Sequence, residues 1–150
     1  EQVASLVGAT GVLAIELFVV RDDHGRPRVL VNEIAPRVHN SGHLTIEASA
    51  TSQFEQHLRA VLDWPLGPTA GTGAVAAMVN VVGDGVHDPL ARQALALAEV
   101  PEAHVHLYGK SARPDRKVGH VTVLGDDLDV VRSAANTAAN LLSGTPRASR

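Results

Sequence analysis

Residues 15–43 read IELFVVRDDHGRPRVLVNEIAPRVHNSGH, two β-branched runs joined by a polar segment and followed by a second polar segment. The runs at 15–20 and 29–31 predict strands, and the Asp, Gly and Pro residues between them predict a hairpin loop. Residues 32–43 carry a carboxylate, a guanidinium and two imidazoles, which is too polar for a core. We therefore expect a functional site on a loop that begins where the second strand ends.

Glu16 and Glu33 are expected to face each other across this hairpin. If Val20 lies opposite Val29, the same register places Glu16 opposite Glu33. Like charges directly opposite each other destabilise an antiparallel pair by up to about 1 kcal/mol, so the pair suggests a cation between them. Magnesium commonly binds one or two carboxylates together with substrate phosphates. The alternative is that both carboxylates lie on a solvated face and pair with arginines of the hairpin loop, because charged strand residues are mostly exposed.

Composition limits the classes of function. The chain has 150 residues, 45% of them hydrophobic, with a formal net charge of -3 and no cysteine. Such a chain can bury a real core, and the lack of thiols excludes disulfides and thiolate catalysis and is compatible with the cytoplasm. A nucleic-acid partner is not expected, because no basic cluster is interleaved with aromatic residues. A membrane partner is not expected either, because no apolar run approaches the roughly 20 residues of a span.

The remaining sequence predicts an α+β fold. Ser52, followed by Glu55, fits a capping box at the start of a helix that Pro65 ends. Residues 65–73 are rich in Gly, Pro and Thr and predict a connection between two subdomains. Strands are expected at 74–82, 104–108 and 118–124, and helices at 2–7, 89–98 and from Asp126 or Asp127 to Leu142.

The segment 108–117, YGKSARPDRK, concentrates positive charge at the end of one predicted strand. Gly109 permits a tight turn, and the cationic side chains are Lys110, Arg113, Arg116 and Lys117. By composition alone, an anion site and a solvated loop are equally supported. His104 and His106 share a strand face with Tyr108, but zinc normally needs at least three protein ligands, so we expect a half-buried polar surface there.

Four blocks of sequence carry a resemblance to a known family. They read ELFV at 16–19, LVNEIAPRVHNSGH at 30–43, TSQFEQHLRAVLDWPLG at 51–67 and HLYGKSARPDRKVGHVTVLG at 106–125. In this order they resemble the C-terminal part of 5-(carboxyamino)imidazole ribonucleotide synthase, an ATP-grasp enzyme family of purine biosynthesis. The resemblance implies that residues 1–67 are the C-terminal part of an ATP-grasp domain and residues 68–150 a small mixed α/β C-terminal domain. Members of the family are considerably longer, so the chain is expected to be a fragment that is not active alone.

The resemblance also implies roles for individual residues. Glu16 and Glu33 match the carboxylates that hold Mg²⁺ on the nucleotide phosphates, and Asn32 belongs to the same ATP-contacting pair as Glu33. The residues that match the contacts to bicarbonate, carboxyphosphate and the aminoimidazole substrate are Arg37, His39, Asn40 and Ser41. The residues that match the grip on the ribonucleotide phosphate are Lys110 together with Arg116 or Lys117. His43 completes the motif without an implied role.

The activity implied by the resemblance is ligase chemistry in the cytoplasm. ATP drives the carboxylation of 5-aminoimidazole ribonucleotide by bicarbonate through carboxyphosphate, giving ADP and phosphate. The complete enzyme is expected to be a homodimer, and the polar loop and the YGK turn are expected to face each other across the domain boundary.

Three other functions remain open at this stage. The first is a formate-dependent glycinamide ribonucleotide transformylase, a sister ATP-grasp enzyme with an acidic Asp-Thr where this chain has Asn40-Ser41. The second is a non-catalytic binding or oligomerisation module, because the lobe that clamps the adenine is missing. The third is a plain α+β domain with an accidental polar loop, which the four matching blocks oppose.

Overall fold

The computed structural model describes residues 2–73 and 75–144. The chain forms two compact units, one up to Ala70 and one from Gly71 onward. Each unit contains its own antiparallel sheet, with two strands in the first and three in the second. The predicted α+β class is confirmed.

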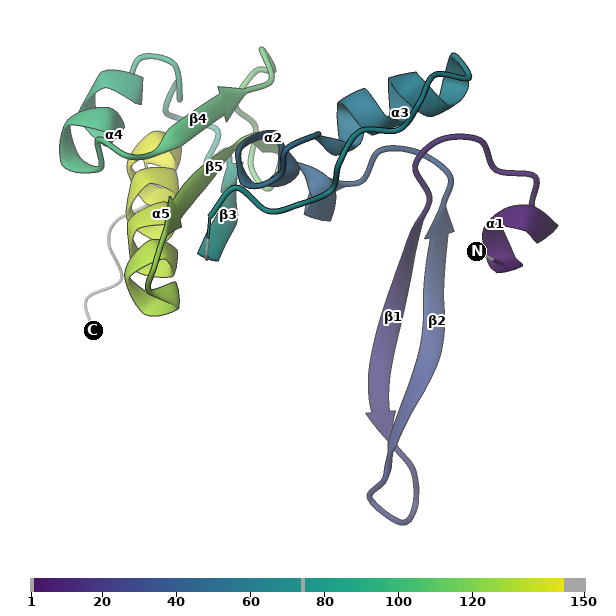
Figure 1. Ribbon diagram of the computed structural model, residues 1–150. Coiled ribbons are helices and arrows are strands. Elements are labelled where there is room, and N and C mark those ends of the chain that lie inside the picture. Colours follow the sequence, from purple (N-terminus) through teal and green to yellow (C-terminus); the bar gives the residue numbers. More distant parts are fainter. Residues whose placement is uncertain (1, 74, 145–150) are drawn as a thin grey trace. The chain divides into compact units, whose positions relative to one another are not determined.

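The first unit is built around a long two-stranded ribbon (Figure 1). After the short helix α1 (Gln2–Leu6), strand β1 (Ala14–Arg21) pairs with strand β2 (Pro27–Ala35). The predicted hairpin is therefore confirmed. Apart from Ala35, which is buried, every residue of β2 is exposed.

The end of β2 differs from the sequence prediction. The strand does not stop after the β-branched run but continues through Asn32 and Glu33 to Ala35. The prediction that these two polar residues begin a loop was therefore wrong, and the loop starts at Pro36. The physical reason is that Ile34 and Ala35 pair with the first two residues of β1, so the strand pairing extends beyond Asn32 and Glu33.

The hairpin loop is closed by Asp22. Its Oδ1 accepts hydrogen bonds of 2.9 Å from the backbone amides of His24 and Arg26, and Gly25 has the left-handed φ of 74° that the turn requires. The backbone hydrogen bond from Arg26 is the largest cause that holds the pKa of Asp22 below its ordinary value. The loop is thus ordered by its own side chains.

Three short helical segments follow the hairpin. They are the 3-10 turn η1 (Asn40–Gly42), the helix α2 (Thr45–Ala48) and the helix α3 (Gln53–Val61). Ser52 caps α3 as predicted, because its side chain accepts from the backbone amide of Glu55. The helix ends earlier than expected from Pro65, and Asp63 beyond it has a positive φ of 56°.

Two polar side chains of α3 hold neighbouring backbone. The amide of Gln56 clamps Gly67, accepting from its N–H at 3.0 Å and donating to its carbonyl at 2.7 Å. Nδ1 of His57 accepts from the backbone amide of Val12 at 3.1 Å. These bonds connect α3 to the segment before β1 and to the segment after the helix.

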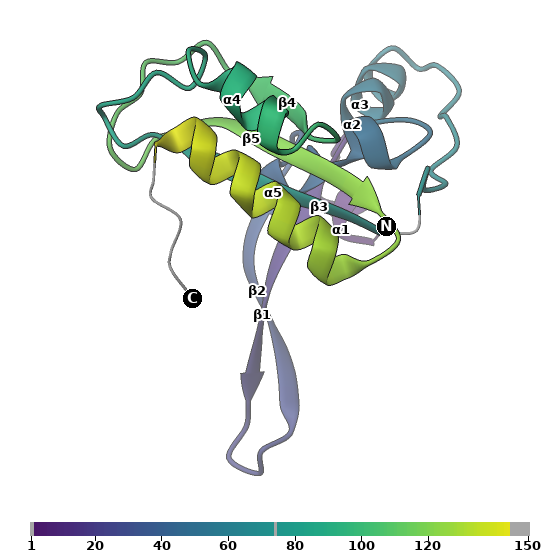
Figure 2. The ribbon, with the colours of Figure 1, turned by 90° about the vertical axis from the view of Figure 1, so that its left-hand side faces the viewer.

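The second unit is a three-stranded antiparallel sheet covered by helices (Figure 2). Its strands are β3 (Val75–Val82), β4 (His104–Leu107) and β5 (Lys117–Gly125), with β5 in the centre. The helices are α4 (Gln93–Glu99) and α5 (Leu128–Ser143), and α5 packs against β3, β5 and α4. All five elements were expected from the sequence, and Ala74, the first residue of the predicted strand 74–82, lies outside the described residues.

The core of the second unit lies between α5 and the sheet. Its fully buried side chains include Val121 and Val123 of β5 and Ala135, Ala138 and Leu142 of α5. Small alanine side chains allow the helix to approach the strands closely. None of the described helices is both long and apolar enough to cross a membrane.

Candidate functional site

The two glutamates of the hairpin lie opposite each other, but not by the expected register. Val29 pairs with Val19 rather than Val20, and a β-bulge after Glu16 restores the pairing of Glu16 with Glu33. The prediction for the valines was wrong by one residue, whereas the prediction for the glutamates is confirmed. Paired residues of an antiparallel ribbon point to the same face, so both carboxylates lie on one side of the hairpin.

Asn32 is the extra residue of the bulge. It has no partner in the ladder, since Leu17 pairs with Val31 and Glu16 with Glu33. Its Nδ2 donates a 3.0 Å hydrogen bond to Oε2 of Glu16. Bulges commonly redirect a side chain next to an active site, and here the bulge gathers an amide and two carboxylates on one side of the ribbon.

His39 connects the loop to the hairpin. Its Nε2 lies 2.9 Å from Oε1 of Glu16, and its side chain is mostly buried, with 15% exposed. Its Nδ1 lies 2.8 Å from Oγ of Ser41 and accepts from the backbone amide of Ser41 at 3.3 Å. Because a backbone N–H can only donate, Nδ1 is the acceptor and Nε2 carries the proton that is donated to Glu16.

The result is a chain of hydrogen bonds from a carboxylate through an imidazole to a hydroxyl. Glu16 orients His39, and His39 accepts from both groups of Ser41. Such an arrangement can position a hydroxyl and move a proton. Asn40 begins η1 between these two loop residues.

Arg37 is the exposed cation of the loop. Its Nη2 lies 3.7 Å from Oε1 of Glu33, and the two side chains are 61% and 53% exposed. Its Nη1 donates to the carbonyl of Val38 at 3.1 Å. A long, solvated ion pair of this kind contributes little to stability, so the guanidinium can turn to an anionic ligand at small cost.

The oxygen atoms around Glu16 and Glu33 fit a hard divalent cation. Each oxygen of an ionised carboxylate has two lone pairs, so the bonds from Asn32 and His39 leave acceptor capacity on Glu16. Residues 2–73 and 75–144 contain no group of three or more His, Cys, Asp or Glu side chains able to hold a metal. A cation here would therefore need further ligands from phosphate or water, which is the usual situation for magnesium.

The predicted cationic segment lies between β4 and β5 in the second unit. Gly109 has a positive φ of 63°, as expected for a tight turn. Lys110 follows it, is exposed, and holds its Nζ 5.3 Å from the centre of the Tyr108 ring. Arg116 donates to Oγ of Ser111 at 3.3 Å, whereas Lys117 is the first residue of β5. Lys110 and Arg116 therefore belong to the turn, and Lys117 belongs to the sheet.

Tyr108, whose ring lies below Lys110, contacts a pair of stacked histidines, His106 and His120. Its hydroxyl lies 2.7 Å from Nδ1 of buried His120, whose ring stacks on that of His106 at 4.6 Å. Burial raises the pKa of Tyr108 above its ordinary value. The half-buried polar surface expected around His106 is therefore present, supported by a residue of the neighbouring strand.

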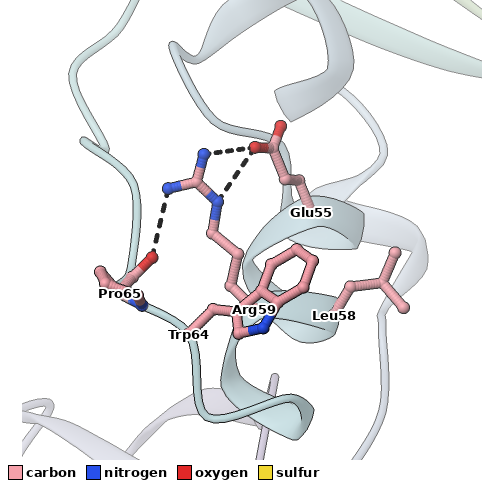
Figure 3. Close-up of a pocket in the computed structure, with 5 residues that line it drawn as sticks. All are labelled: Glu55, Leu58, Arg59, Trp64 and Pro65. Carbon is pink, nitrogen blue, oxygen red and sulfur yellow. Dashed lines mark hydrogen bonds and ion pairs between the residues drawn. The ribbon is translucent and has the colours of Figure 1, made fainter.

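A shallow hollow on the first unit lies apart from these residues. Its volume is about 370 Å³, and it is lined by Glu55, Leu58, Arg59, Trp64 and Pro65. Figure 3 shows that its polar groups bind one another: Arg59 bonds Glu55 and the carbonyl of Pro65. None of the predicted site residues lines it.

One site-supporting residue was missed by sequence reasoning. Gln53, which lies between Ser52 and Glu55 of the predicted capping box, is 8% exposed and hydrogen-bonds both His39 and His43. Its position directly after a capping serine was the only signal in the sequence, and that signal does not distinguish a loop anchor from a solvated first-turn residue.

Comparison with known proteins identifies related domains along the chain. Residues 1–54 match the ATP-grasp domain family, and residues 76–134 match the phosphoribosylaminoimidazole carboxylase C-terminal domain family. The chain is 48% identical over 145 residues to N5-carboxyaminoimidazole ribonucleotide synthase of Mycobacterium tuberculosis (strain ATCC 25618 / H37Rv), covering 95% of this chain and 33% of that protein. It thus spans about a third of the length of such relatives.

Solved structures of related enzymes also match most of this chain. The ATPase subunit of phosphoribosylaminoimidazole carboxylase from Aquifex aeolicus matches with a TM-score of 0.77 and 38% identity, over 94% of this chain and 41% of that one. N5-carboxyaminoimidazole synthase from Aspergillus clavatus, in complex with ADP and 5-aminoimidazole ribonucleotide, matches with a TM-score of 0.73 and 34% identity, over 88% and 35%. The chain is therefore similar to the C-terminal third of N5-carboxyaminoimidazole ribonucleotide synthases, with a match to the ATP-grasp domain family followed by a match to the phosphoribosylaminoimidazole carboxylase C-terminal domain family.

Proposed function

We propose that this chain supplies the metal-binding and carboxyl-transferring part of an ATP-dependent carboxylase that acts on 5-aminoimidazole ribonucleotide. Residues 1–67 would form the C-terminal part of an ATP-grasp domain, and residues 68–150 would form the C-terminal domain that holds the ribonucleotide. Support comes from relatives named N5-carboxyaminoimidazole ribonucleotide synthase and from the related structure that contains ADP and the aminoimidazole ribonucleotide. The enzyme would work as a homodimer in the cytoplasm.

The observation that carries the proposal is the hydrogen-bonded group of side chains near the start of β1 and the end of β2, opposite the hairpin loop. Glu16 binds Asn32 and His39, while Glu33 lies directly opposite on the same face of the ribbon. Glu16 and Glu33 would hold Mg²⁺, which would neutralise charge on the nucleotide phosphates when bound. Asn32, fixed through its Nδ2, would keep its Oδ1 as an acceptor for the nucleotide.

Arg37 would stabilise the anionic intermediates. In the proposed reaction, an oxygen of bicarbonate attacks the γ-phosphorus of ATP, ADP leaves, and carboxyphosphate forms. Protein groups contribute to phosphoryl transfer mainly by positioning and by charge stabilisation. A guanidinium offers two parallel N–H groups to a planar carboxylate, which an ammonium group cannot do. The weak ion pair between Arg37 and Glu33 leaves that side chain able to reach such an anion.

The hydroxyl of Ser41 would accept a hydrogen bond from the 5-amino group of the substrate. In the second step the 5-amino nitrogen attacks the carboxyl carbon of carboxyphosphate, phosphate leaves, and the nitrogen loses a proton. The proton of Ser41 is directed to His39, so the lone pairs of its oxygen can accept from the amino group. His39 can take that proton while Glu16 stabilises the imidazolium. Asn40, at the start of η1, would add contacts to bicarbonate or substrate.

The cationic turn would hold the substrate phosphate. Lys110 projects from the tight turn at Gly109 and lies over the Tyr108 ring. Arg116 and Lys117 would add charge to the same anion site, with Arg116 placed in the turn and Lys117 on the strand that follows it. Several cations are expected around a phosphate that carries close to two negative charges.

The decisive assay uses a chain of full family length that contains these residues. Release of ADP should require bicarbonate and 5-aminoimidazole ribonucleotide together, and formate with glycinamide ribonucleotide should give none. Replacing Glu33 by Gln should weaken Mg²⁺–nucleotide binding at least about tenfold, because a charged ligand of the cation is lost. ADP release that does not depend on the aminoimidazole ribonucleotide would refute the proposed activity.

Calorimetry on the 150-residue chain separates catalysis from simple binding. Titration with ATP and with 5-aminoimidazole ribonucleotide reports which ligands this part of the protein retains. Binding of either ligand that survives the loss of Glu33 and Lys110 would favour a non-catalytic module, because the proposed contacts would then be dispensable.

A further inference from the structure

The side chain of Gln53 forms a closed hydrogen-bonded ring with the backbone of His39. Its Oε1 accepts from the amide of His39 at 2.9 Å, and its Nε2 donates to the carbonyl of the same residue at 2.8 Å. Gln53 is the first residue of α3 and is 8% exposed. A buried amide that is fully bonded in this way stabilises one loop conformation.

These two bonds fix which end of the amide is oxygen. A backbone N–H can only donate and a backbone carbonyl can only accept, so the orientation of the Gln53 amide is determined by His39 alone. The amide nitrogen also lies 2.8 Å from Nδ1 of His43. The nitrogen must therefore donate to His43, whose Nδ1 must accept.

This constraint determines which ring nitrogen of a neutral His43 carries the proton. With Nδ1 as the acceptor, a neutral His43 carries its proton on Nε2. The ring is held further by Phe54, on which it stacks with centroids 5.3 Å apart and planes 27° apart. Orientation and tautomer are thus both set by adjacent residues of α3.

The loop also closes around the backbone of Gln53. Its amide donates to Oγ1 of Thr45 at 2.8 Å, and that hydroxyl donates to the carbonyl of Gly42 at 2.6 Å. A Cβ built at Gly42 would overlap Oε1 of Gln53. The loop therefore needs a glycine at this position, where the chain passes directly over the amide.

We propose that Gln53 is a positioning residue that fixes the backbone of His39 and keeps the proton of His43 on Nε2. His39 then meets Glu16 and Ser41 in one orientation, because its backbone is clamped from the side of α3 and its ring is bonded on both nitrogens. The tautomer of His43 follows from geometry alone, whereas any effect on turnover rests on the proposed carboxylase function.

Nuclear magnetic resonance tests the tautomer directly on the 150-residue chain. Two-bond proton–nitrogen spectra of the imidazoles distinguish rings protonated on Nδ1, on Nε2 or on both. The signals of His43 are identified as those lost in the His43→Asn variant. We expect the Nε2–H pattern near neutral pH; a ring protonated on Nδ1, or on both nitrogens, would overturn the proposal whether or not any variant of Gln53 folds.

The variant Gln53→Glu tests the cause. A carboxylate of the same shape still accepts from the amide of His39 but cannot donate to its carbonyl or to His43. The ring of His43 should then gain a proton on Nδ1. A His43 pattern identical to that of the unmodified chain would refute the assignment of Gln53.

A matched control is available on the same helix. Gln56 clamps Gly67 by the same pair of backbone bonds but touches none of the proposed site residues. In a chain of full family length, Gln53→Glu should lower kcat about ten- to a hundredfold, because small misplacements of reacting groups have effects of this size, whereas Gln56→Glu should not. Equal losses would show that the role of Gln53 is only structural. If the unmodified enzyme lacks carboxylase activity, the proposed function fails and the His43 spectra still decide the positioning role.

Discussion

The substitution Gly42→Ala should disrupt the loop that carries His39. The added methyl group would overlap Oε1 of Gln53 and lie 2.6 Å from its Cδ. The side-chain amide cannot move aside without breaking its bonds to His39 and His43. The perturbation is therefore a direct test of how firmly this amide is held.

The expected loss can be estimated from these bonds. Each contributes about 1 kcal/mol net, so displacement of the amide costs roughly 3 kcal/mol before relaxation. Replacing glycine by alanine also stabilises by about 0.4–1 kcal/mol through the unfolded chain. The net destabilisation of the first unit should be about 2 kcal/mol.

Urea unfolding followed by the fluorescence of Trp64, the one tryptophan of the chain, reports on the first unit. With a slope of about 1–2 kcal/mol/M for a small unit, the midpoint should fall by about 1–2 M. Gly73→Ala is a control in the second unit, where a Cβ would make only an ordinary contact of 3.7 Å with Leu124, so the midpoint that Trp64 reports should not change. An unchanged midpoint for Gly42→Ala would refute the claim that the amide is fixed.

Three further predictions concern single side chains. Arg37→Ala should abolish turnover in a chain of full family length and leave the circular dichroism spectrum unchanged, because its exposed ion pair contributes little; near-normal turnover would contradict its role. Lys110→Ala should raise the KM for the aminoimidazole ribonucleotide about tenfold or more and leave that for ATP unchanged, whereas equal changes in both would remove the phosphate assignment. Hydrogen bonds led by the backbone amide of His87 hold the pKa of Asp84 far below its ordinary value, so its stabilisation is present above the unfolded pKa and is lost as the pH falls. Asp84→Asn should therefore reduce the loss of stability between about pH 5 and pH 3 in urea titrations, and an unchanged pH dependence would contradict this linkage.

The elements were predictable because their signals are local. Runs of β-branched residues, a capping serine and an aspartate before an alanine-rich segment each indicate a structure within one or two turns. Asp127 shows this for α5: its side chain accepts from the amides of Asp129 and Val130, as a residue at an N-cap should. Such contacts span only a few residues, so the sequence displays them directly.

The register of the hairpin was less predictable. Pairing Val20 with Val29 was wrong, and Glu16 still met Glu33 only because Asn32 is inserted as a bulge. A bulge has no reliable signal in a run of strand-forming residues, since any residue can be the extra one. Here the extra residue is polar and bonds a carboxylate of the opposite strand, which is a reason visible only in three dimensions.

The support of the site could not be read from the sequence for the same reason. Gln53 follows a capping serine, where many polar residues are solvated, and only the path of the loop over its amide buries it. Glu16 was predicted to face Glu33, but its contact with His39, whose Nε2 lies 2.9 Å from it, depends on the path of the loop back to the hairpin. The proposed site residues were selected by their types and their order, whereas the groups that hold them depend on contacts between distant segments. Substitutions at Gln53 and Gly42 therefore test the structure more severely than substitutions at Arg37, because nothing in the residue pattern alone would predict their effect.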